Sequence, residues 1–170
     1  MDAFQYVDSG FGYHHSTNEY KVVRILRRCT AAKRRVQVYT LGSSTSDEGW
    51  RDKDNNNIGS YRFTSKGISV NGEIYWLCDD NRTIVAFNVA DETFREFISF
   101  PTDCGGIDRR RYLFKLEGCL CVVERYMHLK KNDVWFIKKK SDTWSWNKEF
   151  SVPINVLTYP FKEWWSFILA

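Results

Sequence analysis

The 170-residue chain is 43% hydrophobic and 27% charged, a balance that is typical of folded domains and unlike that of disordered ones. Its net charge of +4 does not by itself indicate a nucleic-acid-binding protein, and no apolar run approaches the roughly 18 residues of a membrane-spanning helix. The first residues contain neither the basic nor the apolar part of a secretory signal. From the net charge and the lack of a long apolar run we expect no nucleic-acid partner and no membrane partner.

Cysteine and aromatic content point to a reduced, strand-rich protein. The five cysteines are odd in number, lack C-x-x-C spacing, and include Cys119 and Cys121 on one face of an expected strand, which is poor disulfide geometry. We therefore expect reduced thiols and a location in the cytoplasm or nucleus. Aromatic residues make up 16% of the chain, and packing between sheets explains them most simply.

The first expected unit, residues 10–53, has four short runs that are rich in β-branched and aromatic residues. The turn Ser16–Asn18 separates the first run from the second. The runs are Phe11–Tyr13, Tyr20–Leu26, Val36–Leu41 and Trp50–Arg51.

The second expected unit, residues 67–101, is the clearest. Asn71-Gly72 can supply the positive φ angles of a two-residue hairpin turn, and the polar segment Ala90–Thr93 favours another tight turn. These features predict a four-stranded antiparallel meander. Its strands would be Ile68–Val70, Glu73–Cys78, Thr83–Val89 and Phe94–Ile98.

The third expected unit, residues 112–153, repeats the second. Gly118 follows Gly72 at a distance of about 46 residues, and both units close on a proline, Pro101 and Pro153. Units of about 45–50 residues with four strands are typical of propeller blades, so the chain is predicted to be all-β with antiparallel four-stranded blades. An incomplete fourth unit is expected at 159–170. Because three and a half blades close no ring, its apolar edge is a candidate for self-association.

Alternate connections of a meander leave at the same end of the sheet. The longer ones include Cys29–Arg34, Asp79–Arg82, Tyr126–Asn132, Asp52–Lys66 and Thr102–Arg111, and these share one end, which we take as the candidate partner-binding face. Ser43–Gly49 is the exception, a longer connection at the other end. Arginine is favoured at interfaces and holds carboxylates bidentately. The candidate partner-binding residues are Asp79, Asp80, Arg109, Arg110, Arg111, His128, Lys130 and Lys131. Each charged cluster is also explained by a solvated loop.

No catalytic, cofactor or metal site is expected. Asp52, Asp54 and Asn56 resemble the start of a calcium loop, but the glycine and glutamate that such a loop requires are missing. Cys121 and His128 would be the nucleophile and base of an enzyme, yet a cysteine in the middle of a strand is more often a buried, inert thiol.

Several segments, in order and at matching spacing, resemble the F-box-associated domain of plant F-box proteins. The resemblance rests on Gly10–Arg24, Val38–Leu41 with Trp50-Arg51, Gly67–Trp76, Ile84–Phe94, Asp133–Trp135 and Ser145–Lys148. It implies a kelch-like β-propeller that recognises substrates for an SCF-type ubiquitin ligase. No Leu-Pro-led helical F-box precedes Phe11 in this sequence, so only target binding is expected here, and adaptor binding would require an F-box.

Two alternatives stay open from the sequence. A propeller-type enzyme or carbohydrate-binding protein would need convergent carboxylates or a metal at the ring centre. A chain without an F-box would instead compete with a full-length relative for targets. The sequence does not identify the target.

Overall fold

The computed structural model describes residues 6–27, 34–42, 49–53, 58, 61–80, 82–100, 109–140 and 143–153, and every regular element in these ranges is a β-strand. The prediction of an all-β chain is confirmed. Within the same ranges no helix is long and apolar enough to span a membrane. The incomplete unit expected at 159–170 lies outside the described residues.

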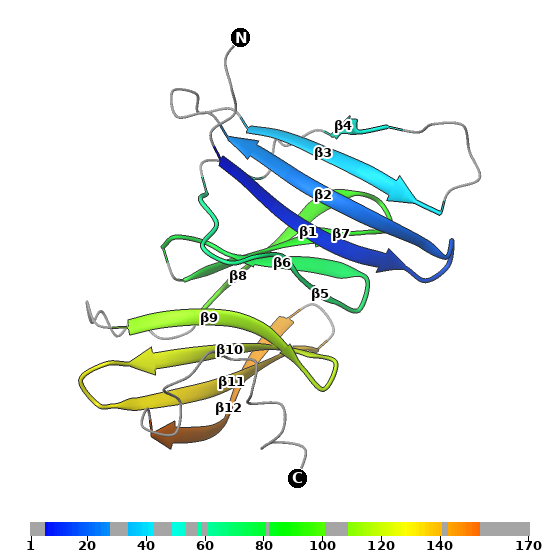
Figure 1. Cartoon of the computed structure of the whole chain (residues 1–170). Helices are drawn as coiled ribbons and strands as arrows, with labels where there is room; N and C mark the ends of the chain where they lie inside the picture. Colours follow the sequence, from blue (N-terminus) through cyan, green and yellow to red (C-terminus); the bar gives the residue numbers. More distant parts are fainter. Residues whose placement is uncertain are drawn as a thin grey trace.

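The strands form three antiparallel sheets of four, which we call the first, second and third sheets (Figure 1). In each sheet the order in space follows the order in the chain. The first sheet contains β1 (Tyr6–His14), β2 (Glu19–Arg27), β3 (Arg34–Leu41) and β4 (Arg51–Lys53). The second contains β5 (Ile68–Val70), β6 (Glu73–Leu77), β7 (Thr83–Asn88) and β8 (Thr93–Ser99). The third contains β9 (Arg109–Leu116), β10 (Cys119–Tyr126), β11 (Lys131–Lys140) and β12 (Thr143–Pro153).

Two hairpins have the turn that their sequences predict. Asn71 and Gly72 have φ angles of 49° and 78°, and Glu117 and Gly118 have φ angles of 48° and 77°. A two-residue turn with both central residues left-handed matches the twist of the flanking strands, and glycine reaches this conformation without steric cost. These turns fix the register of β5 with β6 and of β9 with β10.

The second and third sheets also share an irregularity between their last two strands. The register shifts between Ala86 and Phe87 in β7, and between Val134 and Trp135 in β11. In each case one extra residue lies on the opposite strand, Arg95 in β8 and Glu149 in β12. Such a β-bulge increases the local twist. The second and third sheets therefore repeat each other in strand order and also in having a β-bulge between their last two strands.

The second sheet is buried on both faces. Ile74 and Trp76 of β6 belong to the core shared with the first sheet, whereas Tyr75 and Leu77 belong to the core shared with the third. This alternation follows from the two-residue period of a strand. β6 and β7 consequently have a nearly continuous run of buried residues in place of an apolar–polar alternation.

The first strands of the three sheets are neighbours, with β5 beside both β1 and β9 (Figure 1). The N–H of Gly67, just before β5, donates to the carbonyl of Ser9 at 3.0 Å, and the Trp76 indole N–H donates to the same carbonyl at 3.2 Å. Sheets that turn their first strands toward one another and pack face to face are consistent with the blades of a β-propeller.

Candidate partner-binding face

The two ends of the sheets differ in their connections. The β1–β2, β5–β6, β7–β8 and β9–β10 turns leave at the end that lies to the right in Figure 1, which we call the turn end. The β2–β3, β6–β7 and β10–β11 connections leave at the opposite end, the loop end. The β10–β11 connection is shorter than its expected range of 126–132, because Tyr126 pairs with Lys131 and leaves only Met127–Lys130 as a turn.

Two of the candidate residues, Arg109 and Lys131, meet at the loop end of the third sheet through strand register, with Tyr126 between them. Tyr126 of β10 lies opposite Arg109 of β9 on one side and opposite Lys131 of β11 on the other. The Arg109 guanidinium lies 4.7 Å from the centre of the Tyr126 ring, and the Lys131 Nζ lies 4.6 Å from it. One aromatic ring therefore holds two cations by cation–π contact.

The basic triplet 109–111 was expected in a loop, and the structure corrects this placement. All three arginines belong to β9, where they pair with Glu124–Tyr126. The Arg111 side chain is only 6% exposed, donates to the Glu124 Oε1 at 2.8 Å and stacks 3.9 Å from the centre of the Phe100 ring. The segment looked like a loop because it is polar, but the buried carboxylate of Glu124 pairs with two of its arginines, Arg109 and Arg111. Arg111 therefore does not present its charge to a partner.

A second buried carboxylate lies in the same region. The Asp133 side chain accepts from Lys148 at 2.8 Å, from Ser151 at 2.6 Å and from Lys131 at 3.2 Å. Burial raises the pKa of Asp133, but these hydrogen bonds outweigh burial and the net pKa is lowered. Glu124 is fully buried and also accepts from the Tyr126 hydroxyl at 2.6 Å. The acidic groups of this region are thus neutralised inside the sheet.

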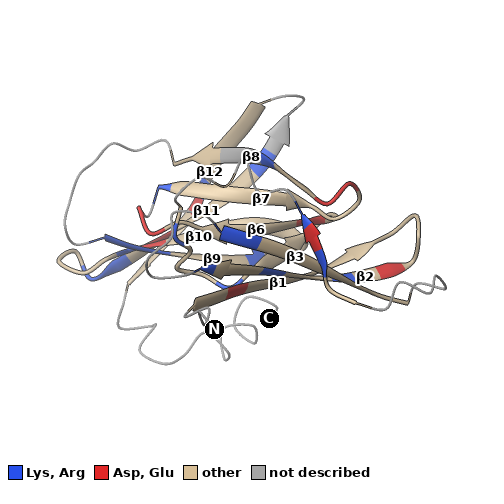
Figure 2. Ribbon diagram, turned by 90° about the horizontal axis from the view of Figure 1, so that it is seen from above, with Lys and Arg blue, Asp and Glu red and all other residues tan. Residues whose placement is uncertain are grey.

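Arg110 and the residues of the β10–β11 turn, which are the exposed side chains described next to this cluster, are basic or apolar. Arg110 and Lys130 are exposed, and within the described residues neither side chain has an ion pair. His128, which belongs to the same turn as Lys130, is also exposed. Across the whole molecule, Lys and Arg lie on strands of all three sheets together with Asp and Glu, so the basic character is local (Figure 2).

The exposed apolar residues of the β10–β11 turn were missed by the sequence analysis, which considered only charge there. Met127 is 50% exposed and Leu129 is 65% exposed, the highest value among the large apolar side chains that the structure describes. The sequence did contain a signal for them, because Met127 and Leu129 alternate with His128 and Lys130 in an otherwise polar turn. A partner could bury both side chains.

Asp79 and Asp80 lie at the loop end of the second sheet, in the β6–β7 connection. Asp80 is occupied locally, since it accepts from the N–H groups of Arg82 and Thr83 at 2.8 Å each and from the Thr83 hydroxyl at 2.6 Å. Burial raises the pKa of Asp80, yet these hydrogen bonds give a lowered net pKa. Asp79 lies 4.0 Å from Arg62. Asp80 therefore shapes the turn, and Asp79 is the more available carboxylate.

Charged side chains also lie at the loop end of the first sheet, namely Asp8, Arg27 and Arg34. Burial raises the pKa of Asp8, opposed by the nearby charges of Arg34 and Arg27. Arg34 is largely buried and lies 5.5 Å from the centre of the Phe63 ring, and Arg27 lies 4.3 Å from the centre of the Tyr6 ring. Each of the three sheets thus carries ionisable side chains at this end.

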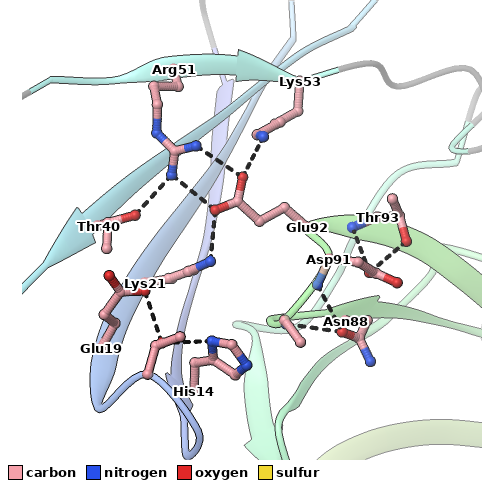
Figure 3. Close-up of polar contacts among 12 residues, drawn as sticks. His14, Glu19, Lys21, Thr40, Arg51, Lys53, Asn88, Asp91, Glu92 and Thr93 are labelled. Carbon is pink, nitrogen blue, oxygen red and sulfur yellow. Dashed lines mark hydrogen bonds and ion pairs between the residues drawn. The ribbon is translucent and has the colours of Figure 1, made fainter. Parts of the chain in front are cut away.

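A buried ion cluster lies at the opposite, turn end and joins the first sheet to the second (Figure 3). The Glu92 side chain extends from the β7–β8 turn and is 6% exposed. It accepts from Lys21 of β2 at 2.8 Å, from Arg51 of β4 at 2.8 and 3.2 Å, and from Lys53 of β4. Burial raises the pKa of Glu92, but the three cations lower it to about 2. Sequence reasoning missed this cluster because its members come from distant parts of the chain.

The residues considered for catalysis and metal binding do not form a site in the described structure. Burial raises the pKa of the Cys121 thiol to about 12, so it is protonated at neutral pH. Asp52 pairs with Arg35 at 2.6 Å, while 54 and 56 lie outside the described residues. Within the described ranges, no three His, Cys, Asp or Glu side chains are grouped so as to hold a metal ion.

Comparison with known families decides where this fold belongs. The family model described as the F-box associated beta propeller domain matches residues 3–163. The chain belongs to the F-box associated β-propeller domain family. The resemblance and the fold class expected from the sequence are both confirmed by this match.

Relatives of this F-box associated domain come from Arabidopsis thaliana. F-box protein At3g07870 is 33% identical over 84% of this chain and 39% of its own length, and F-box/kelch-repeat protein At3g23880 is 30% identical over 86% and 40%. F-box protein CPR1 is 24% identical over 92% and 43%. The chain thus spans about two fifths of the length of the curated relatives it matches. No solved structure matches it significantly.

Proposed function

We propose that this F-box associated domain is a non-catalytic substrate receptor, which binds a target protein so that an SCF-type ubiquitin ligase can modify it. The observation that carries the proposal is the family match across residues 3–163, together with relatives that are named as F-box proteins. The adaptor of the ligase would be contacted by an F-box, and the target by this domain. The compartment we propose is the cytoplasm or nucleus, where Cys78, Cys119 and Cys121 would remain free thiols.

The structure supports a binding role through the contrast between its two ends. At the turn end the β1–β2, β5–β6, β7–β8 and β9–β10 connections are short and Glu92 ties two sheets together, while β3 and β4 are joined there by a longer connection. The loop end carries the exposed apolar residues Met127 and Leu129 beside basic side chains. Exposed apolar side chains on a rigid scaffold are typical of sites that bind other proteins.

A fusion experiment tests this proposal. The 170-residue chain is expressed in plant cells alone and joined to the F-box of a relative, each with a proximity-labelling enzyme. We expect both forms to label the same target proteins, and only the fusion to recover the ligase adaptor and to shorten the half-lives of those targets until the proteasome is inhibited. Adaptor recovery by the chain alone, or unchanged half-lives with the fusion, would contradict the proposal.

A further inference from the structure

We infer that the loop end of the third sheet binds an acidic segment of the target protein that also carries an apolar side chain. This inference rests on the proposed function and specifies the kind of target that the domain would recognise. Three features of the described residues carry it: an exposed apolar turn, unpaired outward cations, and a repulsive pair of arginines.

The apolar turn is a short hairpin turn that strand pairing closes. Its two ends, Tyr126 and Lys131, are paired across β10 and β11, and the Lys130 N–H donates to the Met127 carbonyl at 3.3 Å. Lys130 has a left-handed φ of 49°. Met127 and Leu129 are therefore presented by a tight hairpin turn, and burying them against a partner costs less conformational entropy than ordering a flexible loop would.

The surrounding charge favours an acidic partner. The acids of this region, Glu124 and Asp133, are 0% and 2% exposed and are fully occupied by internal cations. Arg109 and Lys131 share those internal contacts while their side chains remain 23% and 33% exposed. The exposed charges that the structure describes at this turn and at the start of β9 are consequently positive, so they favour an incoming carboxylate.

A repulsive cross-strand pair points to the same ligand. Arg110 of β9 lies directly opposite Arg125 of β10, and like charges in this arrangement are destabilising. Arg125 donates to the Asn132 side chain at 3.1 Å, and no acidic side chain among the described residues pairs with either arginine. A carboxylate of the partner would relieve this repulsion and accept from a guanidinium.

A binding assay with defined peptide pools tests the inference. Fluorescent peptides of one length carry a leucine among Asp and Glu, the same leucine among Lys and Arg, or a serine among Asp and Glu, with the other positions randomised. Fluorescence polarisation with the purified 170-residue chain should show the acidic leucine pool binding at least about tenfold more tightly than either other pool.

Two variants and a matched control locate the site. The double substitution Arg110→Glu with Lys130→Glu, and the double substitution Met127→Ser with Leu129→Ser, should each weaken binding of the acidic leucine pool by about tenfold or more. Lys115→Glu reverses an exposed charge near the turn end of the same β9 strand and should leave binding unchanged. Thermal melting checks that each variant is folded.

Any one of three results with the peptides would overturn the inference: no binding of the acidic leucine pool, equal binding of the basic pool, or an equal loss of affinity in Lys115→Glu. Tighter binding of a short DNA duplex than of any peptide would also overturn it. The fusion experiment separates the two proposals. If the fusion still shortens target half-lives when it carries Arg110→Glu and Lys130→Glu, the receptor function stands and this binding surface is wrong.

Discussion

Glu92 occupies a position that local rules would assign to a solvated turn residue. It has a φ of 59°, a left-handed conformation that is uncommon for a residue with a side chain. Stabilisation that offsets this conformation comes from the first sheet, where Lys21, Arg51 and Lys53 contact the Glu92 carboxylate. A buried carboxylate with several charge-assisted hydrogen bonds favours one packing of the first sheet against the second.

Replacing Glu92 with Gln should lower the free energy of unfolding by about 2 kcal/mol, because three partly buried cations lose their counter-charge. Urea denaturation at neutral pH measures this. Glu117→Gln is the matched control, since Glu117 also has a left-handed φ, of 48°, but is exposed and has no ion pair in the described structure. Equal losses in the two variants would show that the ion cluster contributes nothing specific.

The pKa of Glu92 also predicts how the cluster responds to acid. Because the folded-state pKa is about 2 and the ordinary value is 4.5, the stabilisation is complete above about pH 4.5 and is lost as the pH falls toward 2. This shift corresponds to at most about 3 kcal/mol. The difference in unfolding free energy between the wild type and Glu92→Gln should therefore fall below half of its neutral value by about pH 3. A difference that is constant with pH would refute the assigned pKa.

At the scale of the elements, the second sheet organises the others because both of its faces are covered. The first sheet approaches it most closely at β1, where Gly10 lies against Ile74 and Trp76. A Cβ at position 10 would lie 2.5 Å from a Trp76 ring atom and 2.6 Å from Ile74 Cγ2. Glycine is needed there because the neighbouring atoms are packed in a core that has little room to shift.

Gly10→Ala should therefore destabilise the protein by about 1–3 kcal/mol, which is the usual cost of overpacking a core. Gly49→Ala is the control, because a Cβ there would have no neighbour within 4 Å. Thermal denaturation of both variants checks the prediction. A Gly10→Ala variant as stable as the Gly49→Ala variant would mean that β1 does not pack on Trp76 as described.

The elements themselves were largely predictable, because their determinants are local. Asn71-Gly72 specifies a hairpin turn through the φ angles that it tolerates, and the repeat at Gly118 transfers this interpretation to the third sheet. Arg109–Arg111 was misplaced for the opposite reason. Arg109 and Arg111 belong to a strand because Glu124 of the next strand neutralises them. In a single sequence this partner is not visible, so the charged segment looks like a loop.

The arrangement of the whole molecule was less predictable. The sequence repeat indicated blades and separated the connections into two ends, but it did not show which faces of the sheets meet. That depends on contacts such as Gly10 with Trp76 and Lys21 with Glu92, which join residues more than 60 positions apart. The candidate face was found through its charges, whereas Met127 and Leu129 became visible only when their exposure was known.

At this scale the central claim is that the molecule holds its protein partner at the loop end. A photo-crosslinking amino acid placed at Leu129 and, separately, at Glu117 probes exposed turns at the two ends of the same third sheet. In plant extract we expect crosslinked protein adducts from position 129, lost when Arg110 and Lys130 are changed to Glu, and none above background from position 117. Equal adducts from both positions, or adducts from position 117 alone, would contradict the claim.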